Sequence, residues 1–110
     1  MRIWASTFKD WMKANFTHKE LKDIATNGVV GGTFSGLDNY IDTTHLYNKF
    51  HRELWAIVIS DAWSYGYKNP YSFLGHLHPE YVDGVVDDET HKNFIVWYCA
   101  ESVARQIVGG

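Results

Sequence analysis

Asp61 stands out because helical spacing places it where an apolar core is expected. When the segment from Thr43 to Tyr65 is drawn as a helix, Asp61 falls on the same face as Leu54 and Val58. A carboxylate in such a position is costly unless a partner satisfies it. We therefore predict that Asp61 either pairs with a cation or a backbone group, or serves as a functional carboxylate in a pocket.

Glu101 and Arg105 offer partners for that carboxylate. They are four residues apart, so their side chains lie side by side on a helix. We predict that Arg105 bridges Glu101, Asp61 or both, and that it fixes how two helices dock. Asp61 and Glu101 could also form an acid/base pair of an enzyme, but Arg105 beside them would hold both ionised. The sequence favours a structural polar cluster of Asp61, Glu101 and Arg105.

Other residue patterns give little support to a catalytic or metal site. The His76-x-His78 spacing superficially resembles a metal site, but it does not place two imidazoles on one face of a helix. The glycine-rich segment from Gly28 to Gly36 lacks the Lys and Ser/Thr of a phosphate-binding loop. Cys99 lies within a predicted helix, where an activated thiol is not expected. We therefore expect no cofactor and no metal.

Contact residues are predicted on the surface instead. On the helical wheel, Trp63 falls on the polar side of the long helix. It is either a contact residue, a role in which tryptophan is enriched, or it is covered by the first helix or the glycine-rich segment. The acidic stretch before the last helix is either a solvated loop or a mixed acidic and apolar docking surface. The candidate binding residues are Trp63, Tyr81, Asp83, Asp87 and Asp88.

Helical periodicity and capping signals place these residues in an all-α fold. Thr17 and Glu20 match a capping box, Gly66 suits a helix end, and Asn69-Pro70 suits a helix start. We expect helices at about Ile3–Asn15, Thr17–Gly28, Thr43–Tyr65, Pro70–Leu77 and Glu89–Val108. These four to five helices, with little or no sheet, form a compact bundle around one long central helix.

Length and composition narrow the function further. The 110 residues fit a single domain, 1–110, and an apolar content of 45% is typical of a globular protein. A net charge of −3 disfavours direct nucleic-acid binding, which calls for a basic face. The sequence contains no signal peptide and no apolar run near the roughly 20 residues that span a bilayer. We expect a cytoplasmic protein that makes no contact with membranes.

Three groups of residues resemble a family of small helical proteins carried by bacteriophages and related mobile elements. The resemblance covers roughly Leu21 to Val108. It rests on Gly36-Leu37 with Tyr40, Asp42 and Thr43; on Leu46-Tyr47, Glu53-Leu54-Trp55, Asp61 and Gly66-Tyr67; and on Phe94, Trp97-Tyr98, Glu101 and Val103-Ala104-Arg105. It implies that Asp61, Glu101 and Arg105 belong to a shared scaffold.

The leading hypothesis is a non-enzymatic binder. The small size, the phage resemblance and the surplus of aromatic residues suggest a protein that occupies and blocks a host or defence-system protein, as anti-CRISPR and antirestriction proteins do. One alternative is a small-ligand or nucleotide binder, with Arg52, Lys68 and Arg105 as candidate cations. Another is an enzyme that uses Asp61 and Glu101.

Overall fold

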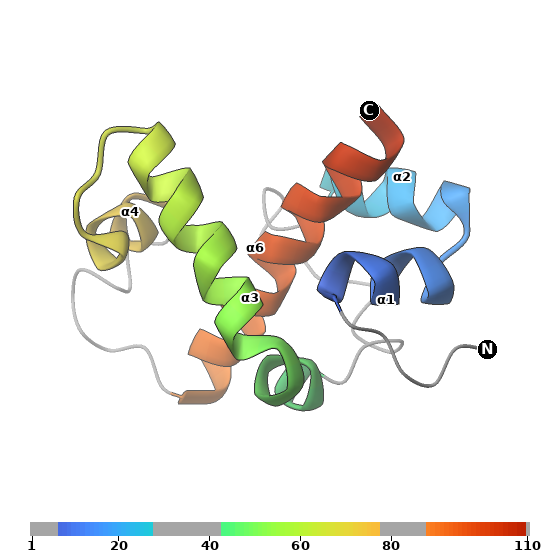
Figure 1. The fold of residues 1–110 in the computed structure, drawn as a ribbon, viewed down its shortest axis with the longest axis horizontal. Helices are drawn as coiled ribbons and strands as arrows, with labels where there is room; N and C mark the ends of the chain where they lie inside the picture. The colour runs from blue at the N-terminus through green and yellow to red at the C-terminus, as the bar shows by residue number, and fades with distance from the viewer. Residues whose placement is uncertain (1–6, 28–42, 78–87, 110) are drawn as a thin grey trace.

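The elements of the fold are helices only. The computed structural model describes residues 7–27, 43–77 and 88–109, and within these it forms five α-helices and no strand (Figure 1). The helices are α1 (Phe8–Asn15), α2 (His18–Asn27), α3 (Thr43–Ser64), α4 (Pro70–Leu77) and α6 (Asp88–Gly109). The all-α prediction is confirmed. None of the helices in these three segments is long and apolar enough to cross a membrane.

Side-chain caps explain where the first two helices begin. Thr7 has an extended backbone and its hydroxyl accepts from the Asp10 amide at 3.0 Å, so α1 begins at Phe8 rather than at Ile3 as predicted. The capping box before α2 is confirmed in both directions. The Thr17 amide donates to Glu20 Oε1 at 2.8 Å, and the Glu20 amide donates to the Thr17 hydroxyl at 3.2 Å.

The turn between α3 and α4 follows the two signals read from the sequence. Gly66 has a φ of +87°, and its amide donates to the Trp63 carbonyl while the Tyr67 amide donates to the Ala62 carbonyl. These two bonds form a Schellman motif, which closes α3. Asn69 Oδ1 then accepts from the Tyr71 amide at 2.8 Å, and α4 begins at the following proline.

The long helix α3 is bent. Phe50 has φ −116° and ψ 16°, which are not helical values, and the first turns of α3 run in a different direction from the rest (Figure 1). The Phe50 ring packs edge-on against Phe8, with centroids 5.6 Å apart. Glu53, in the following turn, accepts from the Phe8 amide at 2.6 Å. A carboxylate of α3 thus satisfies a backbone donor at the start of α1, where negative charge is favoured.

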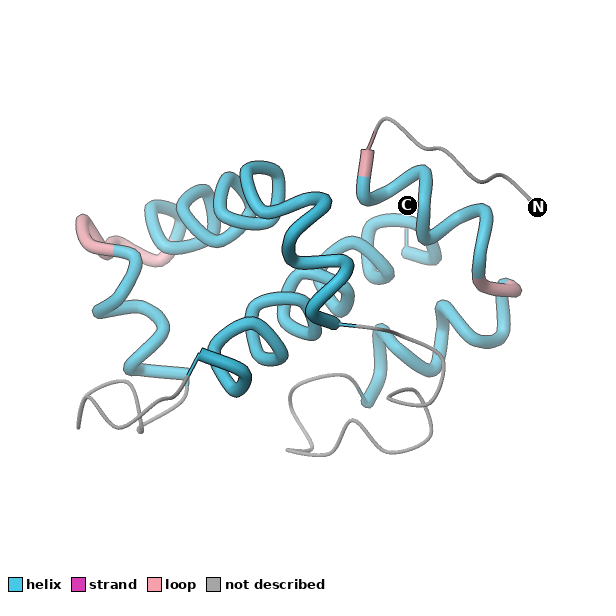
Figure 2. Tube along the Cα trace, turned by 90° about the horizontal axis from the view of Figure 1, so that it is seen from below, coloured by secondary structure: helices cyan, strands magenta, loops and turns pink. Residues whose placement is uncertain are grey.

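The centre of the bundle is α6 rather than α3. It contacts α1, α2 and α3, and it lies between α3–α4 on one side and α1–α2 on the other (Figures 1 and 2). Its middle part is buried on nearly every side; the buried residues are Phe94, Ile95, Val96, Trp97, Cys99, Ala100, Glu101, Val103 and Ala104. A helix that is apolar around most of its circumference is expected in the interior. The predicted compact bundle with a long helix over Thr43–Ser64 is confirmed, and α6, of equal length, is the helix that the others pack around.

Candidate functional site

A cleft lies between the C-terminal end of α3, the helix α4 and the second half of α6. Its larger compartment has a volume of about 590 Å³ and is bounded by residues that include Tyr67, Phe73 and Leu77. A smaller compartment of about 330 Å³ is bounded by Asp61, Ser64 and their neighbours. The two compartments adjoin along four shared lining residues, Tyr65, Tyr98, Glu101 and Arg105, and together we call them the cleft. Phe73 and Tyr67 line only the larger compartment, and Asp61 lines only the smaller one.

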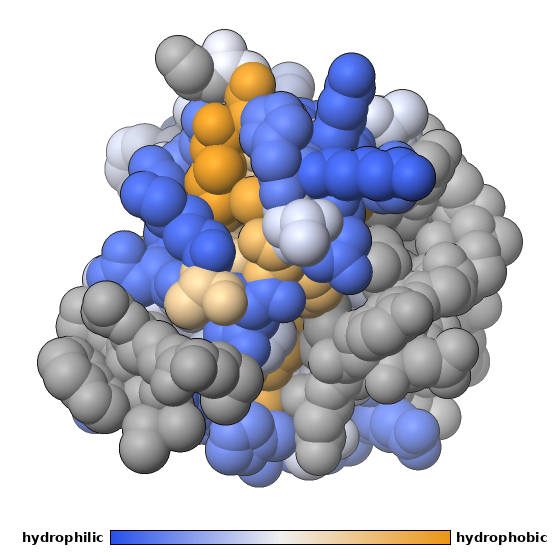
Figure 3. Space-filling view, turned by 90° about the vertical axis from the view of Figure 1, so that its right-hand side faces the viewer, coloured by the Kyte–Doolittle hydropathy of each residue, from blue (hydrophilic) through white to orange (hydrophobic). Residues whose placement is uncertain are grey.

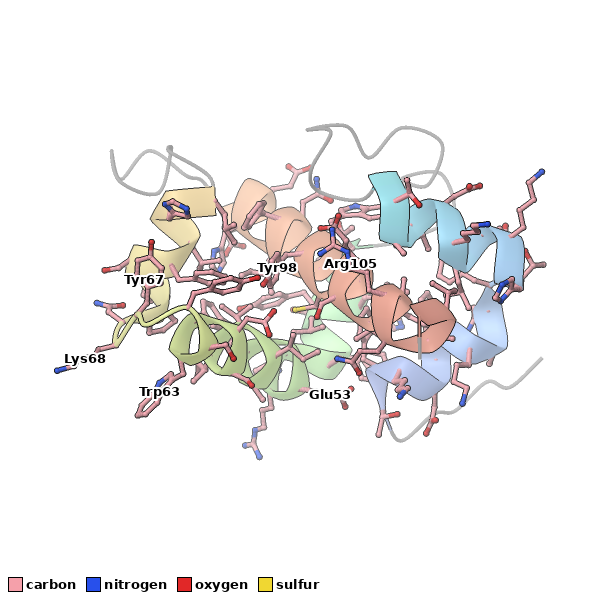
Figure 4. All side chains as sticks on the ribbon, turned by 90° about the horizontal axis from the view of Figure 1, so that it is seen from above. Glu53, Trp63, Tyr67, Lys68, Tyr98 and Arg105 are labelled. Atoms are coloured by element: carbon pink, nitrogen blue, oxygen red, sulfur yellow. The ribbon has the colours of Figure 1, made fainter. Side chains whose placement is uncertain are left out.

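Aromatic rings form much of the cleft wall. Phe73 is buried at the centre of the group, and its ring is stacked on Tyr65 with centroids 5.6 Å apart. Tyr67 lies 5.6 Å from Phe73 in a tilted arrangement, and Tyr98 meets the same ring edge-on at 5.9 Å. His76 packs on the other side of Tyr67. These rings come from three elements, and Figure 4 shows Tyr98 between Tyr67 and Arg105 along the molecule.

Asp61 enters the smaller compartment and is bound by a tyrosine. The Tyr98 hydroxyl donates to Asp61 Oδ2 at 2.5 Å. Burial raises the pKa of Tyr98 well above its usual range, and the hydrogen bond and negative charge of Asp61 raise it further. Among the described residues, the partner of Asp61 is thus a side-chain hydroxyl rather than a cation or a backbone group, and Arg105, which lines the same compartment, binds elsewhere.

That arginine is Arg105, which bridges Glu101 as predicted. Its Nη2 lies 3.0 Å from Glu101 Oε2, and its Nε donates to the Ala25 carbonyl of α2 at 3.3 Å. The Glu101 side chain is only 4% exposed, whereas that of Arg105 is 58% exposed. The pair therefore joins a buried carboxylate to a half-exposed guanidinium, and it connects α6 to the end of α2. The sequence left open whether Arg105 pairs with Glu101, with Asp61 or with both. In the structure it forms the ion pair with Glu101.

The predicted contact residue Trp63 is exposed. Its relative exposure is 70%, and its side chain points away from the bundle on the outer side of α3 (Figure 4). The two sequence alternatives were a contact residue and a covered one, and the exposure fits the first. Trp63 lies outside the cleft, although Tyr65, two residues on, is 72% exposed and lines it.

Only one of the predicted acidic binding residues can be placed. Asp88 is the first residue of α6 and is exposed, and the Lys92 ammonium lies 3.2 Å from its Oδ2. An acidic residue in this position suits the positive end of the helix dipole, so its position has a structural explanation. Tyr81, Asp83 and Asp87 lie outside the described residues.

Sequence reasoning missed a second aromatic group, on the other side of α3. Trp55 Nε1 donates to the Tyr47 hydroxyl at 2.9 Å, and the Trp55 ring lies 5.5 Å from His91 and 5.6 Å from Tyr71. Burial lowers the pKa of His91. The spacing of Tyr47, His51 and Trp55 at i, i+4 and i+8 marks one stripe of α3 and could have indicated this group. It joins α3, α4 and the first turns of α6.

The fold and the cleft define a small helical domain with aromatic side chains both in its core and on its surface. Residues 5–110 match the family described as Domain of unknown function (DUF7222), and the chain therefore belongs to that family. No curated protein and no solved structure matches the chain. The family description names no activity, so the resemblance to phage-borne proteins stays a prediction.

Proposed function

We propose that this protein acts by binding and blocking a partner protein, without catalysing a reaction. The observation that carries the proposal is that the large apolar side chains exposed among the described residues all belong to α3, α4 or the turn between them. We call this surface the apolar end; it consists of Ile59, Trp63, Tyr65, Tyr71 and Leu77. Exposed apolar patches on a soluble domain mark interaction sites, and tryptophan and tyrosine are the residues most often found at binding hot spots.

The arrangement of these residues supports a contact surface. Ile59 and Trp63 are four residues apart, so they are neighbours on the outer side of α3. Tyr65 follows directly after α3, and Tyr71 and Leu77 belong to α4, which packs against α3. The side chains therefore belong to two adjoining elements. A partner that covered them would remove a large apolar area from water.

The opposite end of the molecule has a different character. The face that carries α1, α2 and the end of α6 is mostly hydrophilic, with a narrow apolar strip (Figure 3). The exposed residues of α1 and α2 include Lys13, Lys19, Lys22 and Asp23. This contrast supports the α3–α4 end as the contact surface.

For the class of partner, the sequence supplies the argument. The resemblance to phage-borne proteins and the net charge of −3 favour a host or defence-system protein over nucleic acid. We accordingly propose an inhibitor of the anti-CRISPR or antirestriction type. Asp61 and Glu101, the acids of the enzyme alternative, are engaged by Tyr98 and Arg105 respectively. An inhibitor that acts by contact requires no catalytic role for them.

The test compares Trp63→Ala with a matched control on the same helix, Ser60→Ala, in which another exposed residue changes. Both proteins are used in a plaque assay against a panel of CRISPR and restriction systems, and the affected system is then titrated as a purified complex. Loss of a hot-spot tryptophan costs about 2 kcal/mol or more, which is roughly a thirtyfold loss of affinity. Because Trp63 is exposed, the melting temperature of Trp63→Ala should match that of Ser60→Ala.

The proposal makes two demands on the outcome. The wild-type protein must relieve at least one system in the panel, and Trp63→Ala must weaken that relief while Ser60→Ala does not. If no system responds to the wild type, or if Trp63→Ala inhibits as well as the wild type, this surface does not carry the function.

A further inference from the structure

We propose that the cleft between α3, α4 and α6 binds an organic ammonium group, with its aromatic wall contacting the cation and Asp61 balancing the charge. Tyr65 and Leu77 belong both to the apolar end and to the cleft, but Trp63, on which the test of the inhibitor function depends, lies outside the cleft, so the two proposals can be tested separately. Three observations carry the ammonium proposal: the aromatic wall, the sign of the charge around the cleft, and the position of two helix ends.

The aromatic wall provides the first contact for a cation. Phe73 is buried, Tyr67 and Tyr98 are partly buried and pack against its ring, and Tyr65 is largely exposed and stacked on it; all four rings line the larger compartment. A ring face is electronegative and attracts ammonium and guanidinium groups within about 6 Å of its centre. Rings of this kind around one space are the usual means of binding alkylated ammonium ions. The smaller compartment, which Asp61 lines, has a volume of about 330 Å³ and can hold the ammonium group, and the adjoining compartment of about 590 Å³ can hold its alkyl chain.

The charges around the cleft have a negative balance. Arg105 contributes a positive charge, but Glu101 lies 3.0 Å from it and compensates that charge. Asp61 has no ion pair among the described residues; Tyr98 binds its Oδ2, which leaves Oδ1 to accept from a ligand N–H. His76, from α4, lines the larger compartment on the other side. A cation placed in the smaller compartment, between Asp61 and the rings of Tyr65 and Tyr98, would therefore compensate a carboxylate.

Two helix ends reinforce this field. Ser64 is the last residue of α3 and lines the smaller compartment, and Leu77 is the last residue of α4 and lines the larger one. The C-terminal end of a helix carries a partial negative charge, which favours cations, although in α3 the Ala62 and Trp63 carbonyls already accept from the Schellman motif. The same two ends would repel a phosphate or a carboxylate.

An anionic ligand such as a nucleotide fits the cleft less well. It would need cations, and Arg52 and Lys68, two of the three suggested by the sequence, do not line either compartment. Lys68 points away from the molecule (Figure 4). The third cation, Arg105, is already paired with Glu101. A phosphate in the smaller compartment would face Asp61, and the one cation that lines it among the described residues, Arg105, is shared with Glu101.

The experiment is a titration of the full chain with four small probes, in which changes in the amide NMR shifts report binding. Butylammonium carries charge and N–H donors, tetramethylammonium carries charge alone, butanol carries neither, and inorganic phosphate is the anion. We expect both ammonium ions to shift residues of the cleft with millimolar affinity and butanol and phosphate to leave them unchanged. Because an ion is bound at a partly exposed site, raising the salt concentration should weaken binding.

Two variants and a control connect the binding to the cleft. Asp61→Asn keeps the size of the side chain and should weaken butylammonium about tenfold, whereas Asp23→Asn on exposed α2 should leave the affinity unchanged. If Asp61→Asn destabilises the fold, Tyr65→Leu provides a second test, since this ring is exposed and its loss should weaken both ammonium ions. Trp63→Ala should bind the probes like the wild type, so failure of the inhibitor proposal would leave this one standing.

The source of the ammonium group is decided by two further ligands. Spermidine represents a free amine, and a short lysine-containing peptide represents a side chain of another protein. If either of these ligands binds more tightly than butylammonium, the result supports the cation site and identifies the source of the ammonium group. The proposal is overturned if neither ligand and neither ammonium probe shifts the cleft, if phosphate binds as tightly as butylammonium, or if Asp61→Asn and Tyr65→Leu both leave the affinity unchanged.

Discussion

The ion pair between Glu101 and Arg105 leads to an asymmetric prediction about stability. Arg105→Met keeps an aliphatic side chain at this position. It removes the guanidinium from the buried Glu101 carboxylate, and it also removes the hydrogen bond from Arg105 Nε to the Ala25 carbonyl of α2. In Glu101→Gln the guanidinium that loses its partner is 58% exposed and can be solvated by water. We therefore expect Arg105→Met to be the more destabilising of the two.

The magnitude follows from the geometry of the pair. At the observed separation of 3.0 Å, Coulomb's law gives about 5.5 kcal/mol at an effective dielectric constant of about 20 and about 1.4 kcal/mol at about 80. The exposure of Arg105 places the pair toward the second value, so we expect a coupling energy of about 1–2 kcal/mol. Removing one partner of a fully buried pair costs about 3–5 kcal/mol. For this half-exposed pair we expect about 2–3 kcal/mol for Arg105→Met and about 1 kcal/mol for Glu101→Gln.

The assay is a double-mutant cycle by urea unfolding, followed by tryptophan fluorescence, at low and high salt. The double variant should recover part of the cost of Arg105→Met, because the buried carboxylate that lost its guanidinium is gone. High salt should reduce the coupling only in part, since Glu101 is buried. A coupling energy near zero, or a larger cost for Glu101→Gln than for Arg105→Met, would refute this account of the pair.

Three other predictions concern single sites. Gly66→Ala should lower the free energy of unfolding by about 1–2 kcal/mol in urea titrations, because a φ of +87° is unfavourable for alanine. Steric crowding is not the cause, since no atom lies within 4 Å of the new Cβ. The control Gly109→Ala has equal space and no such φ, and it should leave the free energy of unfolding unchanged. Burial lowers the pKa of His91, so the unfolded chain binds the proton more tightly, and stability should fall as the pH drops through the ordinary value of 6.5; His91→Gln should show a smaller fall in urea midpoint. Burial raises the pKa of the Cys99 thiol, and the negative charges of Asp61 and Glu53 raise it further. The Cys99 Sγ also donates to the Leu54 carbonyl. A thiol reagent should therefore label the folded protein at least about a hundredfold more slowly than the urea-unfolded one.

The helix boundaries were the features most accessible to prediction. Thr17 and Glu20, Gly66, and Asn69 act through backbone groups within a few residues, so their geometry depends on local sequence. The pair formed by Glu101 and Arg105 was predictable for the same reason, since residues four apart meet on any α-helix. The start of α1 was missed although Thr7 carries a similar local signal, because the apolar period continued through Ile3 and Trp4.

The partner of Asp61 could not be read in the same way. The helical wheel correctly placed this carboxylate toward the interior side of α3. Its partner Tyr98 lies 37 residues further along the chain, on α6, and the contact depends on how the two helices cross. A periodic pattern identifies which side of each helix is buried, but it does not specify which residues of two helices meet.

The sequence by itself determined the helices, their caps and the polar residues that would need partners, because these depend on interactions within one or two turns of chain. Only the tertiary structure decided that α6 is central, that Trp63 is exposed and that Asp61 meets Tyr98 beside an aromatic cleft. The physical reason is the range of the interactions. Capping and periodicity are local, whereas the cleft forms where α3, α4 and α6 pack together, and its charge depends on which of its carboxylates Arg105 compensates.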